Sequence, residues 1–271
     1  MNHLSKILIS SFLLATLLFS SCTKIIELDL NTADPQIVVD AQLSDDPAER
    51  ATVQLSKTVN FTNNNTFPFL SNAIIFIKNR TTGETDTLKE TSAGLYKGSK
   101  LLGKVGNTYD LTIKVEGKTI TSSSTIPRKT SLDSISTLKQ SFFGRTSISL
   151  IPRYIDLKGV GDNYRFIMSV NGKVMKNIFV FNDELSDGEL NGRPLFGGGD
   201  DDDEIKIGDS VTLEMRCIDA PNYLYFSTMA DGGGAGNSDS ATPTNPVTNL
   251  NGAILGYFCA YTMQKRTITI Q

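Results

Sequence analysis

Apolar and polar residues alternate along much of the first half of the chain, which is the pattern of half-buried β-strands. The clearest case is residues 109–115, where an apolar side chain occupies every second position. Glu116-Gly117 follows as a hairpin turn, and residues 118–126 return as the partner strand. Short strands at even spacing predict a β-sandwich of immunoglobulin or transthyretin type over residues 36–127. Further strands are expected at residues 37–39, 52–59, 73–78, 84–90 and 94–97.

The same pattern continues over residues 128–271 and predicts a second antiparallel β domain with long loops. Asn171-Gly172 is the strongest hairpin signal, and one short helix is expected at residues 221–229, with Asp219 as its cap. The fold class expected is therefore all-β. Strands are expected at residues 147–157, 164–170, 174–181, 210–218, 254–261 and 266–270. Six aromatic side chains of this half are expected in its core: Tyr223, Tyr225, Phe226, Tyr257, Phe258 and Tyr261.

The first residues have the pattern of a secretory signal. Lys6 precedes an apolar run at residues 7–19, which is shorter than the about 20 apolar residues that span a bilayer core. Ser20-Ser21-Cys22 resembles the lipobox of bacterial lipoproteins, in which the cysteine is acylated and becomes the new N-terminus. We therefore expect a signal peptide over residues 1–21, a lipid such as palmitate on Cys22, and a tether over residues 22–35. A short membrane anchor is the alternative.

Cleavage before Cys22 removes His3, so that residues 22–271 contain neither histidine nor tryptophan. Neither a Ser-His-Asp centre nor a histidine-ligated zinc site can be built without histidine. The net charge of the full chain is −3, and loss of Lys6 makes the remainder one unit more negative, which argues against nucleic acid as a partner. We expect a protein that is not an enzyme and has no cofactor. A hydrolase with a carboxylate pair is the alternative.

The cysteines bear on the compartment. Once Cys22 carries lipid, Cys217 and Cys259 remain as an even pair in an oxidising environment, where disulfides persist. A disulfide between them is one expectation, and two separate buried thiols are the other, because the sequence alone cannot place their Cα atoms within reach.

Residues 200–204 form a run of five acidic side chains, whose carboxylate oxygens are the kind of ligand that calcium binds. It lacks the alternating ligands and the central glycine of an EF-hand loop, so we interpret it as a solvated loop and predict no metal site. The residues of this weak candidate are Asp200, Asp201, Asp202, Asp203 and Glu204.

Several short motifs occur in a fixed order after Cys22. They are residues 25–31 (IIELDLN), 55–59 (LSKTV), 67–68 (FP), 73–77 (AIIFI), 94–96 (GLY), 106–111 (GNTYDL), 124–127 (STIP), 245–246 (NP), Gly252 and 256–261 (GYFCAY). Their joint order resembles a family of Bacteroidota outer-membrane lipoproteins that is described as a domain of unknown function. Members are usually encoded beside TonB-dependent transporters, so the resemblance implies an outer-membrane lipoprotein that partners such a barrel. It implies no reaction and no catalytic residues.

The expected function is therefore that of a lipid-anchored envelope protein, a non-enzymatic accessory or ligand-binding partner of a TonB-dependent outer-membrane transporter. A structural or adhesive cell-surface lipoprotein is the alternative. The membrane face stays open, periplasmic or cell-surface. Surface export in this phylum is associated with acidic residues directly after the cysteine. Here the first acidic residue is Glu27, five positions after Cys22, which is a poor export signal.

Overall fold

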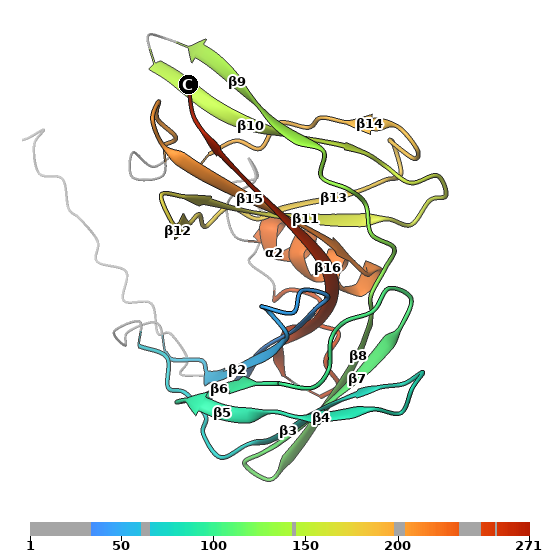
Figure 1. Ribbon diagram of the computed structural model, residues 1–271. Coiled ribbons are helices and arrows are strands. Elements are labelled where there is room, and N and C mark those ends of the chain that lie inside the picture. Colours follow the sequence, from blue (N-terminus) through green and yellow to red (C-terminus); the bar gives the residue numbers. More distant parts are fainter. Residues whose placement is uncertain (1–33, 61–65, 143–144, 198–203, 233–244, 253) are drawn as a thin grey trace, which may run out of the picture. The chain divides into compact units, whose positions relative to one another are not determined.

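Strands make up most of the structure, which is a computed structural model that describes residues 34–60, 66–142, 145–197, 204–232, 245–252 and 254–271 (Figure 1). The helix of this part of the chain is α2 (Ala220–Gly232), and the strands form three sheets. The all-β prediction is confirmed. The predicted cap is confirmed as well, because the Asn222 N–H donates to Oδ1 of Asp219 over 3.2 Å. Within the described residues, no helix has the length and apolarity needed to cross a bilayer.

The largest sheet has nine strands in the order β12-β11-β15-β16-β1-β2-β6-β5, with β13 also paired to β11. All pairs in it are antiparallel except β1 with β16, which are parallel, with Val38 opposite Leu255. The bounds are β1 (Ile37–Ser44), β2 (Ala51–Lys57), β5 (Lys89–Ser92), β6 (Leu95–Lys97), β11 (Asn163–Val170), β12 (Lys173–Val174), β13 (Phe179–Asn182), β15 (Ser210–Ile218) and β16 (Leu255–Thr269).

Two smaller sheets complete the structure. The first has the order β4-β3-β7-β8 and the second β14-β10-β9, and all their pairs are antiparallel. Their bounds are β3 (Ile74–Asn79), β4 (Thr85–Thr87), β7 (Thr108–Val115), β8 (Lys118–Thr125), β9 (Ser134–Phe142), β10 (Arg145–Ile155) and β14 (Leu190–Asn191). Both predicted hairpin turns form, because Glu116-Gly117 and Asn171-Gly172 have the positive φ angles of tight two-residue loops.

The first core lies between the β1-β2 part of the large sheet and the β3-β7 sheet, which makes the N-terminal half a β-sandwich. Strand alternation produces it: Val39, Ala41 and Leu43 of β1 are all buried, and so are Leu111 and Ile113 of β7. The predicted period of two thus directs one side of each strand into the core.

Strand β16 is buried on both faces over residues 256–263, as the apolar run within that part requires. Phe258 and Ala260 enter the first core, whereas Tyr257, Cys259 and Tyr261 pack with the side chains of α2. A third cluster contains Tyr164 and Phe166 of β11 together with buried residues of β10 and β15. The expectation that the C-terminal aromatics belong to the core therefore holds for Tyr225, Phe226, Tyr257, Phe258 and Tyr261, and Tyr223 is half-buried.

Gly256 makes the parallel pairing of β1 with β16 feasible. Its φ is +105°, and a Cβ at this position would lie 1.8 Å from the carbonyl oxygen of Val39. The two backbones therefore approach at a distance that only glycine allows.

The predicted segments differ from the structure in several places. Residues 84–90 were expected as one strand but divide between β4 and β5, and residues 174–181 divide between β12 and β13. Strand β9 was not expected. The C-terminal strand differs as well. Residues 254–261 and 266–270 were expected as two strands but form the single 15-residue β16. The division into domains at residues 36–127 and 128–271 stays a prediction. The first core separates from the other clusters near that point, but β16 serves both sides and Pro35–Gln271 is one compact unit.

Candidate functional site

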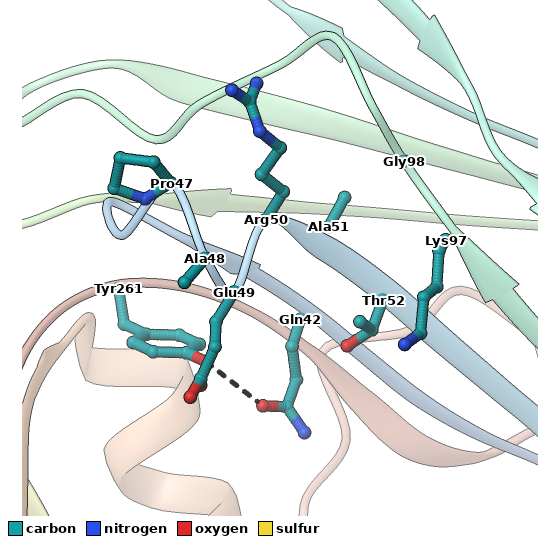
Figure 2. Close-up of a pocket in the computed structure, with 10 residues that line it drawn as sticks. All are labelled: Gln42, Pro47, Ala48, Glu49, Arg50, Ala51, Thr52, Lys97, Gly98 and Tyr261. Carbon is teal, nitrogen blue, oxygen red and sulfur yellow. Dashed lines mark hydrogen bonds between the residues drawn. The ribbon is translucent and has the colours of Figure 1, made fainter.

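A pocket of about 340 Å³ lies where the β1–β2 loop meets β6 and β16, and we call it the Gln42 pocket (Figure 2). Strands β1 and β16 supply Gln42 and Tyr261, and the loop supplies the charged side chains of Glu49 and Arg50. The residues that line it are Gln42, Pro47, Ala48, Glu49, Arg50, Ala51, Thr52, Lys97, Gly98 and Tyr261.

The β1–β2 loop that walls the pocket is held by its own short polar side chains. The Asp46 N–H donates to Oγ of Ser44 over 2.9 Å, which turns the chain directly after β1. Asp45 then joins the loop to β16: its N–H donates to the Tyr261 carbonyl oxygen over 3.1 Å, and its Oδ1 accepts the Met263 N–H over 2.8 Å. The wall is therefore fixed in place by the strand beneath it.

Gln42 has partners for all four of its amide hydrogen bonds. Its Nε2 donates to Oδ1 of Asp40 over 2.7 Å and to the hydroxyl oxygen of Tyr257 over 3.1 Å. Its Oε1 accepts Nη1 of Arg216 over 2.8 Å and the hydroxyl of Tyr261 over 3.3 Å. A primary amide has two donor and two acceptor positions, so this side chain has one fixed orientation.

Behind Gln42, a chain of charges leads to the rim of the pocket. Arg216 lies 4.1 Å from the centre of the Tyr261 ring and pairs with Glu214, which also accepts Nζ of Lys265 over 3.2 Å. Lys265 pairs in turn with Glu49 of the pocket wall. Burial acts to lower the pKa of Lys265, but Glu49 and Glu214 outweigh that effect and the pKa is raised, so the lysine is cationic at neutral pH.

The remaining charges at the rim are positive. The guanidinium of Arg50 donates to the carbonyl oxygen of Lys100 over 3.1 Å, and Lys97 is exposed beside Gly98. Burial raises the pKa of Tyr261, which therefore stays a neutral phenol. The two cations at the rim suit a small polar ligand with an anionic group, whereas the amide of Gln42 has all its positions occupied and fixes the shape of the pocket. Glu49 is the one carboxylate in the lining, and a carboxylate pair is not formed by these ten residues.

A second, shallower hollow of about 440 Å³ lies over β7 and β8. Its charged groups, Arg80 and Asp110, hydrogen-bond to each other, with Nε of Arg80 3.0 Å from Oδ2 of Asp110. The hollow therefore offers mainly Thr, Ser and Asn side chains, and the Gln42 pocket is the better-organised site.

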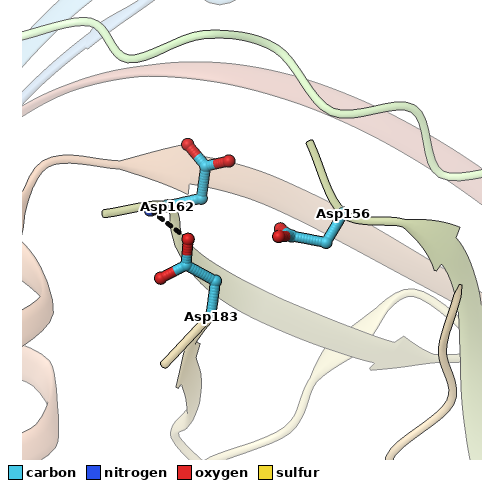
Figure 3. A group of neighbouring side chains, drawn as sticks. All are labelled: Asp156, Asp162 and Asp183. Atoms are coloured by element: carbon cyan, nitrogen blue, oxygen red, sulfur yellow. Dashed lines mark hydrogen bonds between the residues drawn. The ribbon is translucent and has the colours of Figure 1, made fainter. Parts of the chain in front are cut away.

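Three buried aspartates meet at strand ends, with carboxylate oxygens within 4.8 Å of one another (Figure 3). Asp156 follows β10, Asp162 precedes β11 and Asp183 follows β13. Pairing of Asn163 with Asn182 brings the last two together. The sequence analysis missed this cluster, because strand pairing and not spacing assembles it.

Backbone N–H groups and one arginine satisfy two of these carboxylates. Asp183 accepts the N–H of Gly161 over 2.8 Å and that of Asp162 over 3.0 Å. The carboxylate of Asp162 accepts Nε of Arg128 over 2.8 Å. Burial raises the pKa of Asp162, and Arg128 limits the rise.

Asp156 completes the cluster by accepting the Gly188 N–H over 3.1 Å and the hydroxyl of Tyr164. The cluster thus holds three carboxylates and one guanidinium, which is bound to Asp162. Oxygen ligands of this kind suit a hard cation such as Ca²⁺. Among the described residues, these three have the geometry to hold such an ion. Each carboxylate also accepts hydrogen bonds from the protein, so it helps to hold the strand ends together.

Several predicted site residues lie outside the described part of the chain. They are Cys22 and the four aspartates of the acidic run, Asp200, Asp201, Asp202 and Asp203. Glu204, the last residue of that run, is described and exposed. The interpretation of the run as a solvated loop, and the acylation of Cys22, stay predictions.

The disulfide expectation is corrected by the structure, in which Cys217 and Cys259 are separate, free and buried thiols. Cys217 pairs with Thr262 across β15 and β16, and Cys259 lies three residues before Thr262 on the same strand. Because side chains alternate between faces, the two thiols lie on opposite faces of the sheet. Burial raises the pKa of both.

The sequence analysis also missed the Gln42 pocket. The one local signal is the pair Asp40 and Gln42, which are polar side chains on a strand whose alternate residues are apolar. Glu49 follows in the adjacent β1–β2 loop, but Lys97 and Tyr261 come from distant strands that only the fold brings to Gln42.

The fold and the pocket define this molecule as an all-β protein with a β-sandwich and a preformed polar pocket at the edge of that sandwich. Sequence comparison adds the family. The chain belongs to the family described as Domain of unknown function (DUF4249), whose family model matches residues 23–267. No curated protein matches the chain.

Proposed function

We propose that this protein is a lipid-anchored component of the bacterial outer membrane. It binds a small polar ligand in the Gln42 pocket and acts as a non-enzymatic partner of a TonB-dependent transporter. The anchor is the acylated Cys22 that the lipobox-like residues before it predict. The Bacteroidota envelope and the transporter come from the family resemblance described above.

The observation that carries the ligand-binding part is the fully hydrogen-bonded amide of Gln42. Because its four partners fix the side chain, the pocket has its shape before any ligand arrives, which lowers the entropic cost of binding. Arg50 and Lys97 at the rim supply positive charge, and we therefore expect a small carboxylate or another anionic polar molecule.

Co-purification tests the partnership. Tagged protein is extracted from outer membranes in mild detergent, next to a Cys22→Ser variant that cannot be acylated. The lipidated protein should recover a β-barrel transporter, and the variant should leave the membrane fraction. Recovery of the lipidated protein alone contradicts the partnership. A deletion strain that loses attachment but keeps nutrient uptake favours an adhesive role.

Ligand binding is tested separately by thermal unfolding in the presence of a panel of small carboxylates. A ligand that binds only the folded state raises the midpoint as its concentration rises. Lys97→Ala should weaken this shift, whereas Lys118→Ala, at an exposed position on β8 outside the pocket, should not. An equal shift in both variants would remove the pocket from the proposal.

A further inference from the structure

The chain enters the fold at one end of the β-sandwich. Gln36, directly before β1, exchanges two hydrogen bonds of 2.9 Å with Thr58, directly after β2. The first residues of the folded unit therefore lie beside the C-terminal end of β2.

Two exposed phenylalanines lie at the same end. The carbonyl oxygen of Pro68 accepts the N–H of Lys57, the last residue of β2, over 2.9 Å, and Phe69 forms a bridge with Ser56. Phe67 and Phe69 flank Pro68, so both lie beside the last residues of β2. They are 51% and 56% exposed, although large aromatic side chains are ordinarily buried on folding.

The charges around this end favour an anionic surface. An ion pair of 2.6 Å joins Lys57 to Glu116 in the β7–β8 turn, which places that turn at the same end of the sandwich. Lys114 and Lys118 beside the turn are both exposed. The nearby carboxylate of Glu90 accepts the backbone N–H of Asn72, before β3, and that of Gly94, in the β5–β6 turn. The turn and Lys57 together carry three lysines against one glutamate.

We infer that Phe67 and Phe69 enter the lipid surface to which Cys22 is anchored, with Lys114 and Lys118 facing its anionic headgroups. Aromatic side chains with nearby lysines are the groups that settle at a membrane interface. The segment before Pro35 spans at most about 3.5 Å per residue, so it holds the sandwich within about 45 Å of the acyl chains. This inference rests on the proposed anchor and adds an orientation to it.

The chain has no tryptophan, so a single substitution creates a unique fluorescent reporter. The mature lipidated protein is prepared with Phe69→Trp or, as a second reporter at the same site, Phe67→Trp. Leu185→Trp is the matched control, because Leu185 is 89% exposed and lies in the C-terminal half. Each protein is reconstituted into vesicles of phosphatidylethanolamine and phosphatidylglycerol, with and without brominated acyl chains.

In these vesicles, the emission of the Phe69→Trp and Phe67→Trp proteins should shift to the blue relative to the Leu185→Trp control, and brominated lipids should quench it. The Lys114→Glu/Lys118→Glu change in the Phe69→Trp protein should reduce the quenching on anionic vesicles. Solvent-like emission without quenching overturns the inference. So does a blue shift without quenching, which shows that a second copy of the protein covers the patch.

The mass of the N-terminal peptide, measured on the same sample, separates this inference from the anchor. An acylated Cys22 with an unquenched reporter overturns the membrane contact and leaves the anchor standing. A quenched reporter in a chain without acyl groups overturns the anchor and leaves the membrane contact standing.

Discussion

At the scale of the residue, the amide of Gln42 is the best-connected polar group near the pocket. It links β1 to Tyr257 and Tyr261 of β16 and to Arg216 of β15. A buried donor or acceptor that loses its partner costs about 1–3 kcal/mol, so loss of the Gln42 amide should destabilise the protein measurably.

Gln42→Met keeps the volume of the side chain but removes all four hydrogen bonds. Because Asp40, Arg216 and Tyr257 each lose one hydrogen-bond partner, we expect the free energy of unfolding to fall by about 2 kcal/mol in urea denaturation. Gln54→Met on β2 is the matched control: Nε2 of Gln54 is buried without a partner, so its loss should cost less than about 1 kcal/mol. Equal losses in the two variants would contradict the role of Gln42.

The two buried cysteines make a prediction about reactivity. Burial raises the pKa of Cys217 and of Cys259, and the thiolate is the reactive form, so neither should react with iodoacetamide in the folded protein at pH 8. Unfolding in guanidinium without a reductant should expose both to alkylation, as counted by mass spectrometry. Alkylation that needs prior reduction would show that they are bridged after all.

At the scale of the element, β16 depends on one residue without a side chain. The Cβ of Gly256→Ala would meet the backbone of Val39 at 1.8 Å, where no flexible atom can move away. We expect the variant to lose more than about 3 kcal/mol of stability, measured by chemical denaturation. Gly117→Ala serves as the comparison: no atom lies within 4 Å, so it should cost only about 1 kcal/mol, for its positive φ.

The loop before β11 depends on Arg128, whose guanidinium donates to Asp162 and to the carbonyl oxygens of Leu157 and Lys158. Burial raises the pKa of Asp162 above its ordinary 3.8, so the folded state prefers the protonated acid. The contribution of Asp162 to the free energy of unfolding is therefore fully present below pH 3.8 and is lost as the pH rises through the raised pKa. The ion pair with Arg128 limits that loss.

Arg128→Met removes this limit, and we expect it to cost about 1–2 kcal/mol at pH 7.5, because the half-exposed arginine is partly screened by solvent. The cost should be smaller at pH 4, where more Asp162 is protonated. Urea denaturation at both values checks this. Arg80→Met, which breaks the exposed pair with Asp110, should change stability little at either pH. A cost for Arg128→Met that does not depend on pH would remove Asp162 from the explanation.

At the scale of the whole molecule, β16 joins the sandwich to the C-terminal half. Phe258 lies in the first core and Cys259 packs with α2, so both regions lose contacts when this strand is disturbed. Phe258→Ala should cost about 3–5 kcal/mol and lower one common transition, seen alike by circular dichroism and tyrosine fluorescence. Residues 35–127 alone should stay unfolded, because β1 would lack its parallel partner. A stable fragment would support two independent domains.

The sequence predicts the local elements well because one buried face leaves a period of two in each strand, as in residues 109–115. It predicts α2 because Asp219 is a recognisable cap. It does not predict that the last strand pairs with the first, since no turn connects β1 and β16. The pocket and the aspartate cluster cannot be predicted from the sequence for the same reason. Gln42 with Tyr261, and Asp162 with Asp183, become neighbours only through the pairing of strands that are far apart in the sequence.

The parallel contact of Val38 with Leu255 has a consequence for how the chain acquires its structure. During synthesis, β1 is made before the other described strands and its parallel partner β16 is made last, so one side of β1 stays unpaired until almost the entire polypeptide is available. Contacts between such distant segments slow folding, and a bare strand edge invites association with other chains. This protein should therefore refold slowly and aggregate when dilution is insufficient, and its maturation in the cell should depend on a chaperone that shields that edge.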